Sequence, residues 1–312
     1  MDSRKNSCCK GIIQVLGEGE GKYMEHKKVT AVITTYKRDW RTVERALNSI
    51  LGQTVKPYEI FIVDDNNPDT EFSRIIRENA IKIPEVTYIS TETNVGVARA
   101  RNIAVEKAGG DCIAFLDDDD EWTSYKIEKL VSMFDFNPHL GIAFGTAIIV
   151  YDDTDERERN WQYLVFNDRP TYKDMLANDY VGSASAVMLS VKAVKEAGGF
   201  RAVKQPAVED YELWIRIAAI YDIQGTKNVV FIKHMDSKEH VSTNNKRVFL
   251  GFKNIYEIHR DEYEKLPYAR KCILYNVGRY AFRAKTLKGI PYVMKWLSTV
   301  IYIRRTKGKR RK

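Results

Sequence analysis

Residues 29–69 read VTAVITTYKRDWRTVERALNSILGQTVKPYEIFIVDDNNPD, and the order of patterns within them sets the architecture of the chain. A β-branched apolar run at 29–34 predicts a buried strand, and helical spacing of apolar residues predicts a helix over 39–51. A second apolar run at 59–63 predicts another buried strand. Strand, helix and strand in this order form a βαβ unit, whose two strands run parallel.

The same alternation continues through a strand at 86–90, a helix at 96–107 and a strand at 112–116. Beyond residue 123 it loosens into a helix and strands of less regular order, the last of them VVFIKH at 229–234. We therefore predict an α/β fold with a mixed, mostly parallel sheet and helices on both faces.

The domain organisation follows from where this pattern starts and stops. Residues 1–28 show little periodicity and are interpreted as a loose N-terminal leader. Residues 29–243 form one α/β domain in this reading, and residues 244–312 form a helical, basic C-terminal extension.

The composition is that of a folded chain. Hydrophobic residues make up 44% and charged residues 29% of the 312 positions, which excludes a disordered or collagen-like protein. The four cysteines lack a metal-site spacing, and no stretch approaches the ~18 apolar residues of a spanning helix or resembles a signal peptide. We expect reduced thiols and a cytoplasmic location, at the inner face of the cell membrane if the basic extension binds lipid.

Four consecutive aspartates, Asp117–Asp120, follow the buried strand at 112–116. Ligands of open parallel sheets bind at the carboxyl ends of the strands, and like charges this close raise one another's pKa unless a cation is present. Carboxylate oxygens suit Mg²⁺ or Mn²⁺, which take further ligands from substrate phosphates. The alternative is an acidic turn that caps the following helix. Because the chain lacks a GxxxxGK[ST] loop and a GxGxxG after its first strand, metal-mediated diphosphate binding is favoured.

Four ordered blocks resemble the family 2 glycosyltransferases, which have the GT-A fold. They are the opening block already quoted, NVGVARARNIAVEKAGGDCIAFLDDDDEW at 94–122, GSASAVMLSVKAVKEAGGF at 182–200 and VEDYELWIRIA at 208–218. The resemblance covers residues 29–243 and implies a GT-A fold and transfer of a sugar from a nucleoside-diphosphate sugar. Uridine is the base that it favours.

The resemblance also implies roles for individual residues around the donor. Asp65 is a weaker candidate than its neighbour for contact with the base, and Asp117 is expected to reach the ribose or the metal. The residues implied to bind the nucleotide sugar are Thr34, Tyr36, Asp64, Arg101, Asp117 and Asp118. Without the resemblance, a packed aromatic is the favoured explanation of Tyr36, and a helix or turn cap is the favoured explanation of Asp64.

A metal site is implied by the same resemblance, with Mn²⁺ or Mg²⁺ as the cofactor. Asp117-Asp118-Asp119 matches the family's D-x-D motif, although the family often has a small residue where Asp118 stands. Asp119 is the best single ligand and Asp117 a second. The third is expected from a histidine near the last strand, with His234 preferred over His240.

The block at 208–218 implies the catalytic base, which is Asp210. A carboxylate within reach of an acceptor hydroxyl can remove its proton as the oxygen attacks the anomeric carbon. One base without a carboxylate nucleophile implies single displacement with inversion. The Q-x-x-R-W motif of processive members is absent, so we expect one sugar to be added per acceptor, a glycan or lipid-linked glycan of bacterial surface polysaccharide assembly.

Residues 285–312 contain no Asp or Glu and hold much of the net charge of +8. Two interpretations stay open: peripheral contact with an anionic membrane, or a helix packed on the domain followed by a solvated tail. Two other function classes also stay open, a metal-dependent nucleotidyltransferase and a non-catalytic basic nucleic-acid-binding protein. The latter is disfavoured, because no nucleic-acid-binding motif is present and the aspartates would repel phosphates.

Overall fold

The computed structural model describes residues 27–151, 167–201, 207–235 and 244–309. Its centre is an eight-stranded sheet in the order β3-β2-β1-β4-β7-β6-β8-β5. The strands are β1 (Val29–Thr35), β2 (Glu59–Asp64), β3 (Val86–Ser90), β4 (Cys112–Asp117), β5 (Glu121–Trp122), β6 (Leu140–Tyr151), β7 (Val187–Ser190) and β8 (Asp222–Met235). The longer helices beside the sheet are α1 (Trp40–Leu51), α2 (Glu71–Ala80), α3 (Val97–Lys107), α4 (Lys126–Phe136) and α7 (Glu209–Ala218).

The first half of the chain forms the parallel part of the sheet, as predicted. β1 pairs in parallel with β2 and β4, and β2 pairs in parallel with β3. Local chemistry explains where α1 begins, because the Asp39 carboxylate caps the helix by accepting from the Thr42 backbone N–H at 3.0 Å. The apolar side chains of α1 are buried against the sheet.

The second half makes the sheet mixed. β7 runs antiparallel to both β4 and β6, whereas β6 and β8 run parallel to each other and β5 runs antiparallel to β8. The last strand is longer than the predicted 229–234, because β8 begins at Asp222. The first half of β8 has polar residues in place of an apolar run, so its sequence does not indicate a strand. The predicted α/β class with a mixed, mostly parallel sheet is confirmed.

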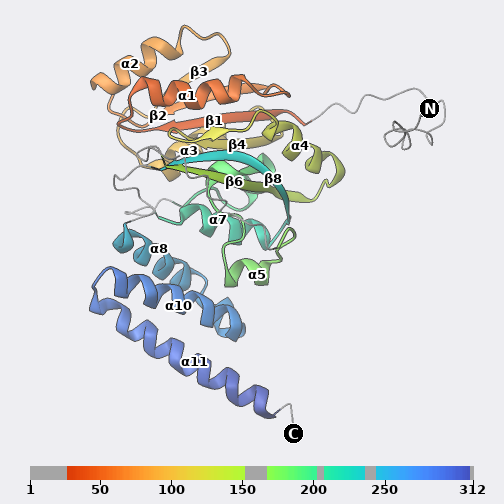
Figure 1. The fold of residues 1–312 in the computed structure, drawn as a ribbon, viewed down its shortest axis with the longest axis vertical. Helices are drawn as coiled ribbons and strands as arrows, with labels where there is room; N and C mark the ends of the chain where they lie inside the picture. Colours follow the sequence, from red (N-terminus) through yellow and green to blue (C-terminus); the bar gives the residue numbers. More distant parts are fainter. Residues whose placement is uncertain (1–26, 152–166, 202–206, 236–243, 310–312) are drawn as a thin grey trace, which may run out of the picture.

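A helical layer follows the sheet domain and packs beside α7 and α5 (Tyr172–Ala177) (Figure 1). It consists of α8 (Asn245–Ile258), α9 (Arg260–Lys265), α10 (Pro267–Arg283) and α11 (Ile290–Lys309). α8 approaches closely where a Cβ on Gly251 would lie 2.2 Å from the Ala207 carbonyl oxygen, so only glycine fits there. Buried residues of α8 and α10, such as Phe249 and Leu274, belong to the same apolar cluster as the sheet.

Two sequence-based expectations concern the membrane and the cysteines. Among the residues that the structure describes, no helix combines the length and the apolar character needed to cross a bilayer. Cys112 is buried and Cys272 is half-buried, and both are free thiols. Residues 1–26 of the predicted leader at 1–28, and His240, lie outside the described residues.

Candidate active site

The carboxyl ends of β1, β2 and β4 meet at one edge of the sheet. In the strand register, Thr34 lies opposite Asp117 and Thr35 lies opposite Asp64. The polar clusters that follow three separate strands in the sequence are therefore neighbours in space, as expected for the ligand-binding edge of a parallel sheet.

The acidic loop, which we define as Asp117–Asp120, brings four carboxyl groups together at the end of β4. Burial, with the nearby charges of Asp119 and Asp117, raises the pKa of Asp118 to about 6. Burial and the same two neighbours raise the pKa of Asp120 to about 8. A cation at this loop would offset a repulsion that the protein otherwise carries.

Two arginines near or in α1 hold the acidic loop. Arg38 Nε lies 3.0 Å from Asp118 Oδ1, and its Nη2 lies 2.7 Å from Asp119 Oδ2. Arg45 Nη2 donates to the Asp119 carbonyl oxygen at 2.7 Å, and its Nε lies 3.6 Å from Glu121 Oε1. In this structure, a guanidinium thus pairs with the Asp119 carboxylate that we expect to bind a metal.

The fit of the acidic loop to a divalent cation can be judged from its donor atoms. Hard carboxylate oxygens that lie close together suit Mg²⁺ or Mn²⁺. In the described ranges, no three His, Cys, Asp or Glu residues stand together as a ready-made ligand group. His234 lies on β8 with its Nε2 2.7 Å from Glu121 Oε1. The loop therefore fits a cation held by one or two carboxylates and completed by substrate phosphates, and the role of His234 stays a prediction.

The expected nucleotide-binding residues differ in their exposure. Tyr36, at the end of β1, is 45% exposed, with Lys37 Nζ 5.2 Å from its ring centroid. Asp64 is fully buried, where one carboxylate oxygen accepts from the Asn66 backbone and side-chain amides and the other accepts from Tyr88 Oη at 2.8 Å. The ring of Tyr36 is accessible to a base, whereas Asp64 can reach one only if its internal hydrogen bonds are exchanged.

Asp65, the weaker candidate beside Asp64, has a structural task. Its carboxylate accepts from the backbone N–H groups of Val95 and Gly96 at 2.8 and 2.9 Å and from Thr91 Oγ1 at 2.9 Å. These bonds hold the loop that leads into α3. The position of α3, and of Arg101 on it, therefore depends on Asp65.

Arg101 connects the two halves of the site. Its guanidinium is buried and donates to Asp117 Oδ1 at 2.8 Å and to Glu209 Oε1 at 3.1 Å. It also stacks near Phe115 and Phe200, with its central carbon 5.9 and 5.4 Å from the ring centroids. Arg101 thus fixes the end of β4 relative to the start of α7, and the partner Glu209 was not anticipated from the sequence.

Asp210 stands in the first turn of α7, where the predicted base was expected. Burial, followed by the charges of Glu209 and Asp179, raises the pKa of Asp210 to about 8, although Arg101 acts in the opposite direction. The preceding residue but one, Val208, has a left-handed backbone with φ of 63°, a costly conformation for a β-branched side chain. A carboxyl group with a raised pKa behind a strained residue has the character of a functional acid or base.

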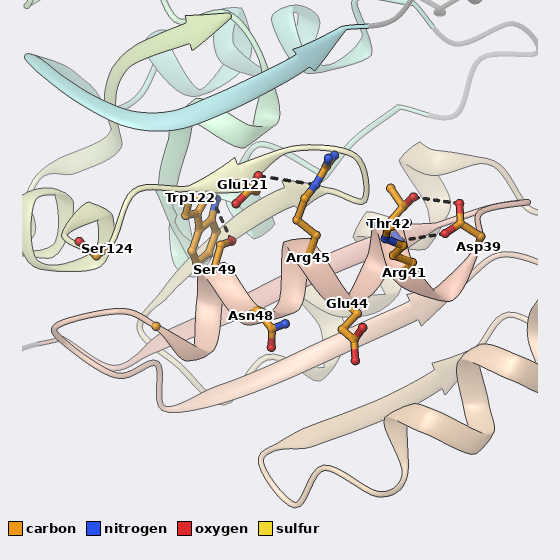
Figure 2. A pocket seen from close by; sticks show the side chains of 11 residues that line it. Asp39, Arg41, Thr42, Glu44, Arg45, Asn48, Ser49, Glu121, Trp122 and Ser124 are labelled. Atoms are coloured by element: carbon orange, nitrogen blue, oxygen red, sulfur yellow. Dashed lines mark hydrogen bonds and ion pairs between the residues drawn. The ribbon is translucent and has the colours of Figure 1, made fainter. Parts of the chain in front are cut away.

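A groove of about 880 Å³ lies along the polar face of α1, next to β5 (Figure 2). Its lining includes Thr42, Arg45, Ser49, Glu121 and Trp122. Figure 2 shows Arg45 reaching from α1 to Glu121. None of the predicted donor-site residues lines this groove, so it is separate from the strand-end site.

Sequence reasoning missed three residues that organise the site. They are Arg38, Arg45 and Glu209. Arg38 stands two positions after Tyr36 in the opening block, and Glu209 precedes the predicted base directly. The charge of Arg38 and Glu209 next to site residues was a usable signal, but the choice of partner for all three depends on tertiary contacts between segments 74 to 108 residues apart.

Comparison with known proteins identifies the family of the chain. The model of glycosyl transferase family 2 matches residues 30–198. The chain is 26% identical over 271 residues to the Escherichia coli UDP-Glc:alpha-D-GlcNAc-diphosphoundecaprenol beta-1,3-glucosyltransferase WfgD, covering 85% of this chain and 100% of that protein. It is 31% identical over 166 residues to the putative teichuronic acid biosynthesis glycosyltransferase TuaG of Bacillus subtilis, covering 52% and 62%.

The fold also matches solved structures. The S. aureus TarS 1–349 structure in complex with UDP-GlcNAc superposes with a TM-score of 0.58 at 16% identity, over 87% of this chain and 79% of that one. This likeness confirms the predicted GT-A fold. The match to the family model favours sugar transfer over the nucleotidyl transfer and nucleic-acid binding that composition left open. By its sheet, its ordered sequence blocks and its match to the family model over more than half its length, the chain belongs to glycosyl transferase family 2.

Proposed function

We propose that the protein transfers one sugar from a UDP-linked donor to a hydroxyl of a lipid-linked glycan, with inversion, during assembly of a bacterial surface polysaccharide. The donor class is supported by the UDP-glucose in the name of WfgD and the UDP-GlcNAc bound to TarS. The acceptor class is supported by the diphosphoundecaprenol in the name of WfgD, and the setting by the name of TuaG.

The observation that carries this proposal is the position of Asp210. It stands in the first turn of α7, and the adjoining Glu209 is tied through Arg101 to Asp117 at the donor edge of the sheet. Asp210 is also near enough to Arg101 for their charges to interact, which supports a base beside a donor held at the acidic loop. In the reaction, the acceptor O–H gives its proton to Asp210 as its oxygen bonds to the anomeric carbon and the nucleoside diphosphate leaves.

The leaving diphosphate carries charge that the strand-end site must stabilise. A divalent cation, when bound, would supply the opposing positive charge. Asp117 and Asp119 would hold this cation, with His234 as a further candidate ligand. Arg38 now pairs with Asp119, so it would have to give up this partner. Its positive charge then stays beside the diphosphate.

The stereochemistry of transfer tests the proposed displacement. With UDP-glucose and a short-chain analogue of GlcNAc-diphospholipid, we expect a product that has gained one sugar in the configuration opposite to that of the donor. Proton NMR of the anomeric centre and mass spectrometry of the product measure both properties. Retention of configuration would refute the single displacement, and products with several added sugars would refute non-processive transfer.

Donor and metal binding can be tested apart from turnover. We expect UDP with Mn²⁺ to raise the melting temperature more than GDP or dTDP, and chelator to remove the effect, because a ligand at a hundredfold excess over Kd stabilises by about 2.7 kcal/mol. Asp119→Ala should abolish the shift. The matched control is Glu85→Ala, an exposed carboxylate near the start of β3, at the opposite edge of the sheet. An equal shift in Asp119→Ala would show that this carboxylate does not hold the metal.

A further inference from the structure

α11 has one face that packs on the protein. Tyr292 is buried and its Oη donates to Glu257 Oε1 at 2.8 Å, and Thr299 is 1% exposed. Trp296 is half-buried near Tyr275 of α10, with ring centroids 6.3 Å apart. These residues recur at helical spacing, so they define a single inner face that fixes α11 to α8 and α10.

The opposite face of α11 is apolar and exposed. Its residues follow the spacing i, i+3, i+4, i+7 and i+11, which places them in one stripe along the helix. We call this the outer stripe: Ile290 (54% exposed), Val293 (39%), Met294 (62%), Leu297 (44%) and Ile301 (49%). A continuous apolar stripe of this length marks a surface that contacts something other than water.

Two more apolar side chains extend this surface at the turn before α11. Phe282, at the end of α10, is 86% exposed, and Leu287 is 81% exposed. α11 is also the outermost layer of the molecule, on the side away from the sheet (Figure 1). The outer stripe and this turn are therefore accessible together in the described structure.

The charge around the outer stripe is of one sign. Exposed cations include Lys288 at the turn before it, and Arg304 and Arg305 continue it towards the C-terminus. No Asp or Glu occurs after Glu264, whereas residues 265–312 contain 15 Lys and Arg. With a net charge of +8 overall, the rest of the chain is net negative by 7. The charge is thus strongly asymmetric along the chain, and its positive end carries the outer stripe.

We propose that the outer stripe of α11 and its flanking cations bind the surface of an anionic phospholipid bilayer. An amphipathic helix lying in the headgroup region buries its apolar face among acyl chains and places its lysines and arginines on lipid phosphates. A second copy of this chain fits the surface poorly, because a two-fold contact would bring two basic segments together without acidic partners. This inference does not depend on the sugar or acceptor proposed above.

Vesicle binding by the full chain tests the proposal. We expect co-sedimentation with large vesicles of equimolar phosphatidylcholine and phosphatidylglycerol, much weaker binding to phosphatidylcholine alone, and a decrease as salt is raised. An excess of soluble glycerol phosphate should leave binding largely intact, since the free headgroup offers no apolar phase. Equal binding to both vesicle types, or no binding, would overturn the proposal.

Substitutions in the outer stripe and its cations test whether vesicle binding depends on this surface or is unspecific. Leu297→Glu with Ile301→Glu should weaken vesicle binding at least about tenfold, because two apolar side chains are lost to the bilayer. Arg304→Glu with Arg305→Glu should weaken it at least about 20-fold, because each cation contributes about fivefold near an anionic surface. All four side chains are exposed or half-exposed, so melting temperatures should stay close to wild type.

The matched controls are exposed apolar residues on the sheet domain. Ile81→Glu and Phe136→Glu change side chains that are 67% and 79% exposed, and should leave vesicle binding unchanged. Loss of binding in these controls equal to that in the stripe variants would refute a role for α11. Analytical ultracentrifugation tests whether a second copy of the chain binds the outer stripe instead. A wild-type dimer that becomes a monomer in the Leu297→Glu with Ile301→Glu variant would assign the stripe to self-association and overturn the proposal.

Discussion

Asp210→Asn should reduce kcat by about a thousandfold and at the same time stabilise the folded protein at pH 8. The rate falls because an amide cannot take the proton of the acceptor hydroxyl, a contribution of roughly 10² to 10⁴ in enzymes that use a general base. For wild type, the rate should rise with pH up to the pKa of Asp210, which is raised to about 8 by burial and by Glu209 and Asp179. A pH–rate profile of both proteins measures this.

The stability effect follows from proton linkage. The pKa of Asp210 is higher in the folded chain than its ordinary value of 3.8, so the folded state binds the proton more tightly. Stability therefore falls as pH rises from about 4 towards 8, and Asn removes that cost. Thermal melts at pH 5 and pH 8 should show an advantage of the variant that grows with pH.

The control for Asp210→Asn is Asp261→Asn, which alters an exposed aspartate in the first turn of α9. It should change neither the rate nor the pH dependence of stability. If Asp210→Asn kept more than about a tenth of the rate, another group would have to act as the base. If the stability of Asp210→Asn showed the same pH dependence as that of wild type, ionisation of Asp210 would not lower the free energy of unfolding.

Glu212→Gln should lower the free energy of unfolding by about 3 kcal/mol at neutral pH, one of the largest single-residue effects on stability in the chain. Glu212 accepts from Arg216 Nη2 at 2.7 Å and from Arg201 Nη1 at 2.9 Å, and its Oε1 lies 3.3 Å from His259 Nε2. Glutamine would leave these donors facing a neutral group in a buried setting. Urea denaturation measures the loss.

The pH dependence of this loss has a definite sign. Burial alone would raise the pKa of Glu212, but hydrogen bonds from His259 and Arg216 and the nearby arginine charges lower it to about 2. Its contribution is therefore complete above about pH 4.5, the ordinary value for glutamate, and is lost as pH falls towards 2. The two proteins should converge in stability over that interval.

Glu106→Gln is the matched control, because Glu106 is exposed on α3. It should stay within about 0.5 kcal/mol of wild type. If the Glu212→Gln protein were as stable as this control, the desolvation cost of the buried Glu212 charge would equal the stabilisation from its arginine and histidine partners.

Most of the parallel part of the fold was predictable, because each of its elements is encoded locally. β1, β2 and β4 are apolar runs, and α1 has a capping aspartate and an apolar stripe. β5 was not predictable: a pair of residues, Glu121 and Trp122, becomes a strand only because β8 lies beside it. The first part of β8 was missed for the same reason.

The sequence predicts which strand ends form the site, but it does not predict which side chains pair there. That Thr34, Asp64 and Asp117 would meet at one edge follows from parallel pairing. That Arg101 would join Asp117 to Glu209, or that Arg38 would pair with the acidic loop, depends on distances between distant segments. The burial of Asp64 has the same origin, since its partner Tyr88 is on β3.

The closeness of α8 to the start of α7 has a thermodynamic consequence. Gly251 touches the backbone at Ala207, His259 contacts Glu212, and the apolar residues of α8 and α10 continue the core of the sheet. Because the described parts of the helical extension and the sheet share one apolar core, we expect them to unfold cooperatively. A ligand that binds the helical extension therefore raises the unfolding temperature of the catalytic sheet as well, and a nucleotide bound at the sheet protects the extension in turn.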